Sequence, residues 1–165
     1  MRNADRLDAT DARLLLALSE SPRASVLALS ERLGLSRNTV QARLAGLEAR
    51  GVLASFERRI DPAALGFPLT AYVMVQVVQR LLDEVAAALG GVPEVLEVQG
   101  VSGPSDLLVK VVARDGDDLY RIAGLLLAIE GVERTSTSMV MTTLVEHRVA
   151  PLLQQRAAPA PPPGG

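Results

Sequence analysis

The chain has 165 residues, of which 48% are hydrophobic and 22% are charged, so it can bury a sizeable core and is not a disordered chain. It has no cysteine and a single histidine, His147, which excludes disulfides and thiol nucleophiles and leaves little for a zinc site or a histidine-based triad. No apolar run reaches the roughly 18 residues that span a bilayer, and the first residues are charged and polar. We therefore expect a cytoplasmic protein with no membrane partner, no metal and no cofactor.

The net charge of −2 conceals an uneven distribution. Residues 1–60 contain ten arginines against seven acidic residues, whereas residues 61–165 contain seven basic and twelve acidic residues. This asymmetry indicates an N-terminal part that binds a polyanion and a C-terminal part with another role. Statistical scatter is the alternative explanation.

The N-terminal sequence predicts three helices. The first should cover residues 9–19 with Asp8 as its N-cap, the second residues 25–33, and the third should follow Ser36 and end near residue 50. The short connection through residues 34–36 has the spacing of a helix-turn-helix.

The third helix carries the candidate DNA-binding residues. If Val40 points into the core, the outer face is polar or small and has no acidic residue before Glu48. Such a face suits base edges and phosphates, and a strand or wing over residues 52–60 would add arginines on the backbone. The alternatives are a solvated helix face and a linker strand with exposed charge. The candidate DNA-binding residues are Ser36, Arg37, Asn38, Thr39, Gln41, Arg43, Arg58 and Arg59.

The second half of the chain reads as strand–helix–strand–strand–helix–strand, which is the ferredoxin-like order. The expected elements are strands at 69–78, 95–101, 107–113 and 132–145, with helices at 81–89 and from about 117 to 129. We therefore predict an α+β chain with a winged helix-turn-helix domain (1–60), a hinge (61–66), a ferredoxin-like βαββαβ domain (67–153) and a disordered proline-rich tail (154–165). One sheet face should remain apolar, and we expect a second copy of the chain to cover it.

Several segments in order resemble the leucine-responsive regulatory protein (Lrp)/AsnC family of transcription regulators. The resemblance spans Leu7 to Leu153 and includes the entry to the first helix at 7–11, the run LSRNTVQAR at 35–43, and the hinge IDP at 60–62. It continues through GVSGPSD at 100–106 and RTSTS at 134–138.

The resemblance implies a winged helix-turn-helix followed by a small-molecule regulatory (RAM-type) domain. It implies a pseudo-palindromic double-stranded operator, homodimers that often assemble to octamers, and an amino acid or related metabolite as effector. The implied effector-binding residues are Val101, Ser102, Gly103, Ser105, Asp106, Thr135, Ser136, Thr137 and Ser138. The threonines and the serines fall on opposite faces of the fourth strand, so one pair would contact the ligand, and β-propensity at an interface is the alternative reason for their presence. The aromatic residue that the family often has before the loop aspartate is Ser105 here, preceded by Pro104. Asp106 would hold an amino group or, alternatively, serve as a turn residue bonded to backbone.

Two other functions are open at this stage. Siroheme decarboxylases resemble the same family in fold, but the stretch at 58–67 contains no histidine, and His147 lies instead beside Arg148 near the predicted end of the fourth strand. An architectural DNA-organising protein is the other alternative, although a net charge of −2 argues against pure packaging. We expect a regulator rather than an enzyme.

Overall fold

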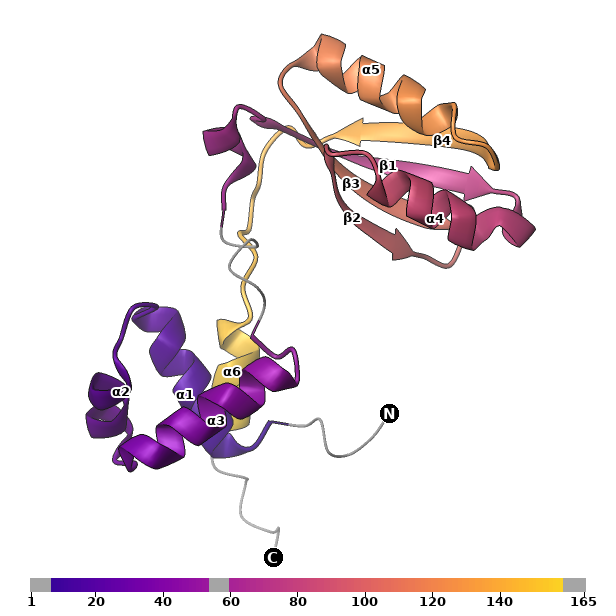
Figure 1. Cartoon of the computed structure of the whole chain (residues 1–165). Helices are drawn as coiled ribbons and strands as arrows, with labels where there is room; N and C mark the ends of the chain where they lie inside the picture. Colours follow the sequence, from indigo (N-terminus) through magenta and orange to yellow (C-terminus); the bar gives the residue numbers. More distant parts are fainter. Residues whose placement is uncertain (1–6, 54–59, 159–165) are drawn as a thin grey trace, which may run out of the picture. The chain divides into compact units, whose positions relative to one another are not determined.

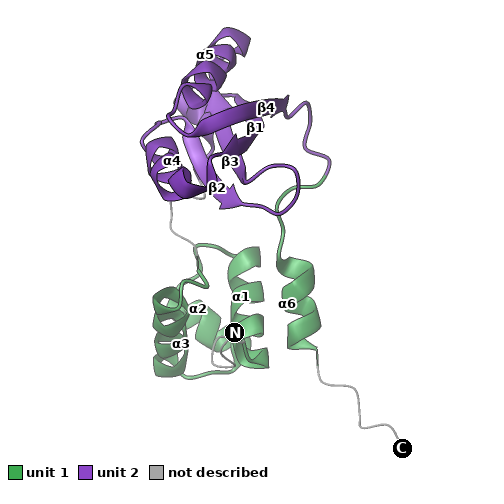
Figure 2. Ribbon diagram, turned by 90° about the vertical axis from the view of Figure 1, so that its right-hand side faces the viewer, with its two compact units in different colours: residues 1–56, 145–165 green, residues 57–144 purple. Residues whose placement is uncertain are grey.

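The computed structural model describes residues 7–53 and 60–158, and the chain divides into two compact units (Figure 2). The helical unit comprises residues 1–56 together with 145–165, and the sheet unit comprises residues 57–144. The helical unit is therefore assembled from both ends of the chain. Over the described ranges, no helix has the length and apolar character needed to cross a membrane.

The helical unit contains the three predicted N-terminal helices, which are α1 (Ala9–Glu20), α2 (Val26–Leu33) and α3 (Arg37–Ala49) (Figure 1). Each begins at a residue whose side chain accepts a backbone N–H of the first turn, namely Asp8, Ser25 and Ser36. Capping of this kind satisfies backbone donors that the helix itself leaves unpaired. Gly34 ends α2 in the left-handed conformation, which glycine adopts without steric cost.

A fourth helix of the helical unit corrects the predicted division of the chain. Helix α6 (Ala150–Ala157) lies where the sequence predicted the end of the ferredoxin-like domain at 153 and a disordered tail from 154. Its Leu153 is 8% exposed and packs in the cluster formed by α1, α2 and α3. The helix forms because its apolar side is buried against α1, and Pro151 lies in the first turn, where proline removes no helical hydrogen bond.

The sheet unit has the predicted ferredoxin-like order. Its elements are β1 (Leu69–Val77), α4 (Leu82–Gly90), β2 (Val95–Gly100), β3 (Leu107–Ala113), α5 (Gly116–Leu127) and β4 (Val132–Met139), with short 3₁₀ helices η3 (Pro62–Leu65) and η4 (Gln79–Leu81). The antiparallel sheet has the order β2-β3-β1-β4, so the first and third strands are central. Helix η3 occupies the predicted hinge.

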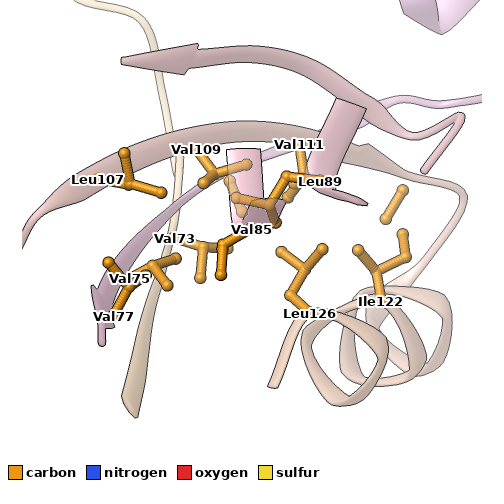
Figure 3. Packing of buried hydrophobic residues seen from close by; sticks show 12 residues of the cluster. Val73, Val75, Val77, Val85, Leu89, Leu107, Val109, Val111, Ile122 and Leu126 are labelled. Atoms are coloured by element: carbon orange, nitrogen blue, oxygen red, sulfur yellow. The ribbon is translucent and has the colours of Figure 1, made fainter. Parts of the chain in front are cut away.

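The core of the sheet unit lies between one sheet face and the two helices α4 and α5 (Figure 3). Alternate residues of β1 point into it, and in register with them lie alternate residues of β3. The core residues labelled in Figure 3 are Val73, Val75, Val77, Val85, Leu89, Leu107, Val109, Val111, Ile122 and Leu126. Branched side chains with this period are what the sequence predicted.

Strand β4 is shorter than predicted. It ends at Met139 rather than at residue 145, because the pairing with β1 reaches Ala71 there and the partner strand begins at Leu69. One further bond, from the Val140 N–H to the Thr70 carbonyl at 2.9 Å, completes the ladder. β-propensity alone does not extend a strand beyond the length of its partner.

The sheet face away from the helices carries Tyr72 and Met74, which are 38% and 40% exposed. Their cross-strand partners on β4 are Ser138 and Ser136. On β3 the partners of Tyr72 and Met74 are Lys110 and Leu108, so large apolar groups lie at the centre of a face of mixed polarity.

Candidate functional site

The N-terminus of α3 is built from Ser36 and Thr39. The Ser36 hydroxyl accepts the Thr39 backbone N–H at 3.1 Å, and the two hydroxyls lie 2.8 Å apart. Both predicted contact residues therefore have a structural role, which is to cap α3. Both are also exposed at the surface.

The predicted outer face of α3 is present. Arg37, Asn38 and Gln41 are exposed, and so are Ala42 and Ala45 further along the same face. On the opposite side, Val40 and Leu47 are fully buried. The first turn carries no acidic residue, so nothing in it repels a phosphate.

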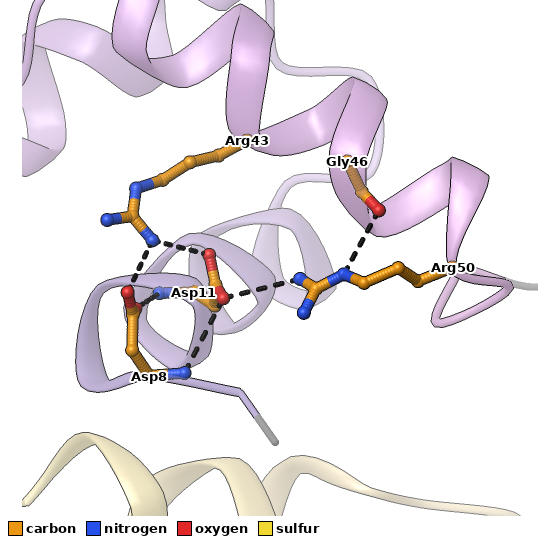
Figure 4. A network of polar contacts seen from close by, with 5 residues as sticks. All are labelled: Asp8, Asp11, Arg43, Gly46 and Arg50. Atoms are coloured by element: carbon orange, nitrogen blue, oxygen red, sulfur yellow. Dashed lines mark hydrogen bonds and ion pairs between the residues drawn. The ribbon is translucent and has the colours of Figure 1, made fainter. Parts of the chain in front are cut away.

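Arg43 occupies a different environment from the one expected of a DNA contact (Figure 4). Its Nη1 lies 2.7 Å from Asp8 Oδ2 and 2.7 Å from Asp11 Oδ1, both at the N-terminus of α1. Arg50, at the C-cap of α3, places Nη2 at 3.5 Å from Asp11 Oδ2 and donates through Nε to the Gly46 carbonyl at 3.1 Å. The side chain that sequence reasoning assigned to DNA is engaged inside the unit.

These contacts perturb the acid–base equilibria of the pair. The pKa of Asp8 is lowered, first by the Asp11 backbone N–H that its carboxylate accepts and then by Arg43. The pKa of Arg43 is raised, chiefly by its hydrogen bonds to Asp8 and Asp11. Both shifts favour the charged forms, as expected for a hydrogen-bonded ion pair. Arg58 and Arg59 of the predicted wing lie outside the described residues.

The predicted effector loop is held by Asp106. Its Oδ2 accepts the Val77 backbone N–H at 2.9 Å, and its Oδ1 accepts from Gln79 Nε2 at 2.5 Å. Gln76 donates its side-chain amide to the Pro104 carbonyl on the other side of the loop. Asp106 therefore accepts a backbone hydrogen bond from β1, and both of its carboxylate oxygens have protein partners.

Sequence reasoning missed the two glutamines. Gln76 lies 28 residues before Pro104 and Gln79 lies 27 residues before Asp106, and no spacing rule links them to the loop. The remaining loop candidates Val101, Ser102 and Gly103 are exposed, while Ser105 is half-buried.

The four hydroxyl residues of β4 divide between the faces of the sheet, as alternation predicts. Ser136 and Ser138 pair with Met74 and Tyr72 on the open face. Thr135 and Thr137 pair with Val75 and Val73, whose side chains face the helices.

Comparisons with known proteins identify the domain family of each part of the chain. The AsnC-type helix-turn-helix domain family matches residues 7–48, and the Lrp/AsnC ligand binding domain family matches residues 70–150. The chain is 32% identical to the HTH-type transcriptional regulator FL11 of Pyrococcus horikoshii, over 88% of this chain and 97% of FL11.

Two solved structures are similar over most of the chain. The feast or famine regulatory protein from M. tuberculosis, complexed with L-methionine, has a TM-score of 0.77 at 29% identity and covers 87% of this chain and 98% of its own. A transcriptional regulator from Neisseria meningitidis, also in complex with L-Met, has a TM-score of 0.74 at 27% identity and covers 86% and 94%.

A helix-turn-helix unit followed by a ferredoxin-like ligand-binding unit defines a DNA-binding transcription regulator that responds to a small molecule. The chain belongs to the Lrp/AsnC family. The resemblance and the fold class predicted from the sequence are confirmed.

Proposed function

We propose that this regulator reads DNA through the N-terminal half of α3 and that an amino acid bound in the sheet unit modulates this binding. The observation that carries the proposal is the exposed face of the N-terminal half of α3, which has no acidic residue before Glu48 and on which Arg37, Asn38 and Gln41 lie together. Arginine pairs with guanine edges or phosphates, and asparagine and glutamine pair with adenine edges.

Neighbouring residues suit close approach to a groove. Ala42 and Ala45 are small and exposed on the same helix face, so the backbone of α3 can lie near the groove floor. Ser36 and Thr39 at the cap can donate to phosphates, as can Arg58 and Arg59 in the segment predicted as a wing.

The proposed effector class is an amino acid, because the two similar structures described above are complexes with L-methionine. The candidate site is the loop at 101–106 together with the hydroxyl residues at 135–138. Because both Asp106 oxygens are engaged, a ligand ammonium would take the place of the Gln79 amide on Oδ1.

The proposed assembly is a homodimer in which a second copy of the chain covers the open sheet face around Tyr72 and Met74, with octamers formed from such dimers. Exposed apolar groups of this size in the centre of a sheet favour association. A dimer would present two α3 helices to successive major grooves of a pseudo-palindromic operator.

We favour a regulator over the siroheme-decarboxylase-like and architectural alternatives. The relatives described above carry the names of regulators, and the slightly acidic chain lacks the basic excess of a packaging protein.

The test is fluorescence anisotropy with DNA from upstream of the gene that encodes this chain, against scrambled DNA of equal length. Both are titrated near physiological salt, with and without single amino acids, beginning with L-methionine. We expect preference for the upstream DNA and a change in apparent affinity with one amino acid, of about five- to 150-fold.

Binding to neither DNA at low salt would contradict the DNA-reading role. Binding that no amino acid alters would contradict the effector class and leave the DNA role standing.

A further inference from the structure

Asp11 connects the beginning of α1 to two points on α3. Its Oδ1 accepts from Arg43 in the middle of α3, and its Oδ2 accepts from Arg50 at the C-cap. Asp8 supports the same group, because its carboxylate contacts Arg43 Nη1 and accepts the Asp11 N–H at 2.7 Å. Figure 4 shows the two arginines of α3 converging on these acids.

The network is more than a surface ion pair. The side chain of Asp11 is only 8% exposed, whereas those of Arg43 and Arg50 are about one-third exposed. Exposed pairs contribute little to stability, but removal of one partner of a buried pair leaves a charge or a polar group unsatisfied. Asp11 therefore constrains the two arginines more strongly than an exposed acid would.

Apolar packing holds α3 along a single stripe. Within α3, all thirteen residues of which are described, Val40 and Leu47 are buried and Leu44 packs half-buried beside them, so the stripe leaves room for a small tilt that polar contacts can fix. A helix of this length is roughly 20 Å long, so a tilt of about 5° moves one end by nearly 2 Å. Binding residues have to be held within about 0.5 Å to keep their contacts.

We propose that Asp11 is a positioning residue for DNA recognition, which sets the orientation of α3 on α1 through Arg43 and Arg50. Arg43 then serves as an internal clamp and is not a phosphate contact, because two carboxylates already neutralise it. The exposed residues Arg37, Asn38 and Gln41 make the contacts that the clamp aligns. This inference rests on the proposed role of α3 in reading DNA.

The test uses the full chain and a duplex that the unaltered protein selects from a random-sequence pool. Affinity for this duplex and for a scrambled one is measured over a range of salt concentrations for Asp11→Asn, Arg43→Gln and the double variant. Thermal melting by circular dichroism checks that each variant folds. If Asp11→Asn does not fold, Arg43→Gln still tests the proposal.

We expect Asp11→Asn and Arg43→Gln each to lower the ratio of selected to scrambled affinity by at least about fivefold, as the loss of one base-pair contact would. The double variant should be no worse than either single variant, because both changes break the same clamp. The slope of log affinity against log salt should stay unchanged in Arg43→Gln, whereas Arg37→Ala should reduce its magnitude by about 0.9.

Glu20→Gln is the matched control. It removes an acidic group at the other end of α1, where Glu20 forms an exposed pair with Arg32, and changes the net charge by the same amount. The discrimination ratio should not change in this control.

Two results would overturn the inference. One is a loss of salt slope in Arg43→Gln equal to that in Arg37→Ala, which would make Arg43 a phosphate contact. The other is an unchanged ratio in both single variants. Failure of the proposed function would look different, because the random pool would then yield no selected duplex or Arg37→Ala would bind it normally.

Discussion

Gly131 stands at a point where the backbone and the core together exclude a side chain. Its φ is +93°, and a Cβ there would lie 3.0 Å from atoms of both Leu81 and Val85. Its carbonyl also accepts the Val78 N–H at 2.8 Å, which ties the turn before β4 to the end of β1. A substitution at this position combines backbone strain with overpacking.

We expect Gly131→Ala to destabilise the sheet unit by about 1–3 kcal/mol more than Gly66→Ala. Gly66 has a similar φ of +90° but nothing within 4 Å of its Cβ position, so the difference isolates the crowding. Urea unfolding of the two variants measures it. Equal destabilisation would show that Leu81 and Val85 move aside without cost.

We expect Asp118 to contribute to the acid sensitivity of the sheet unit. It is 5% exposed, and its carboxylate accepts the backbone N–H of Arg114 and the guanidinium groups of Arg114 and Arg121. The hydrogen bonds from Arg114, with a further one from Arg121, hold the pKa of Asp118 far below its ordinary range.

A depressed pKa in the folded state means that the unfolded state binds the proton first. The stabilisation that the ionised Asp118 gives to the folded state is therefore fully present above about pH 4, which is the pKa of an aspartate in the unfolded chain. It is lost as the pH falls towards the pKa of Asp118 in the folded state. We expect Asp118→Asn to melt at a lower temperature than the unaltered chain at pH 7 and to lose less on acidification to pH 3. Asp117→Asn, at an exposed position in the same turn, is the control, and an identical acid response in both variants would contradict this assignment.

At the level of elements, α6 supplies a core residue of the helical unit from the other end of the chain. Leu153 is 8% exposed, whereas the adjacent Leu152 is 64% exposed. We expect Leu153→Ala to destabilise the helical unit by about 2–5 kcal/mol and Leu152→Ala to have little effect. Thermal melts followed at the helical circular dichroism signal make the comparison, and equal melting temperatures would show that α6 does not stabilise α1.

Elements with strong local signals could be predicted from the sequence, and those that depend on distant partners could not. The helices from Asp8 to Arg50 have their caps and apolar stripes within their own residues, and the βαββαβ order follows from alternation and turn residues. Helix α6 was missed because its apolar side is buried against α1, a segment far away in the sequence, and the local pattern does not show that contact.

The same distinction, between local signals and distant partners, explains which features of the candidate site could be predicted from the sequence. Exposure of Arg37, Asn38 and Gln41 follows from helical periodicity about Val40. The environment of Arg43 depends on Asp8, which is thirty-five residues away in the sequence, and that of Asp106 on Gln79, twenty-seven residues away. Periodicity gives the face of a helix but does not say which side chains of another element meet it.

At the level of the whole molecule, the open sheet face gives a direct test of assembly. We expect Met74→Glu to weaken self-association at least about tenfold, because it places a charge in the centre of the proposed dimer interface. Sedimentation velocity over a concentration series measures this, with Tyr120→Glu as the control. Tyr120 is 84% exposed on α5. If Tyr120→Glu caused dissociation and Met74→Glu did not, the interface would lie on the face of the sheet unit that carries α5 and not on the open sheet face.

The return of the chain to α1 also bears on how the protein is made. The DNA-binding unit is discontinuous, since the whole sheet unit is inserted between α3 and α6. On the ribosome, α1, α2 and α3 emerge first, but the Leu153 position in their core is filled only after the ligand-binding unit has been synthesised. A chain that terminates before residue 150 therefore has an incomplete helical unit with exposed apolar surface, and the DNA-binding unit becomes complete last, in chains that already carry their regulatory unit.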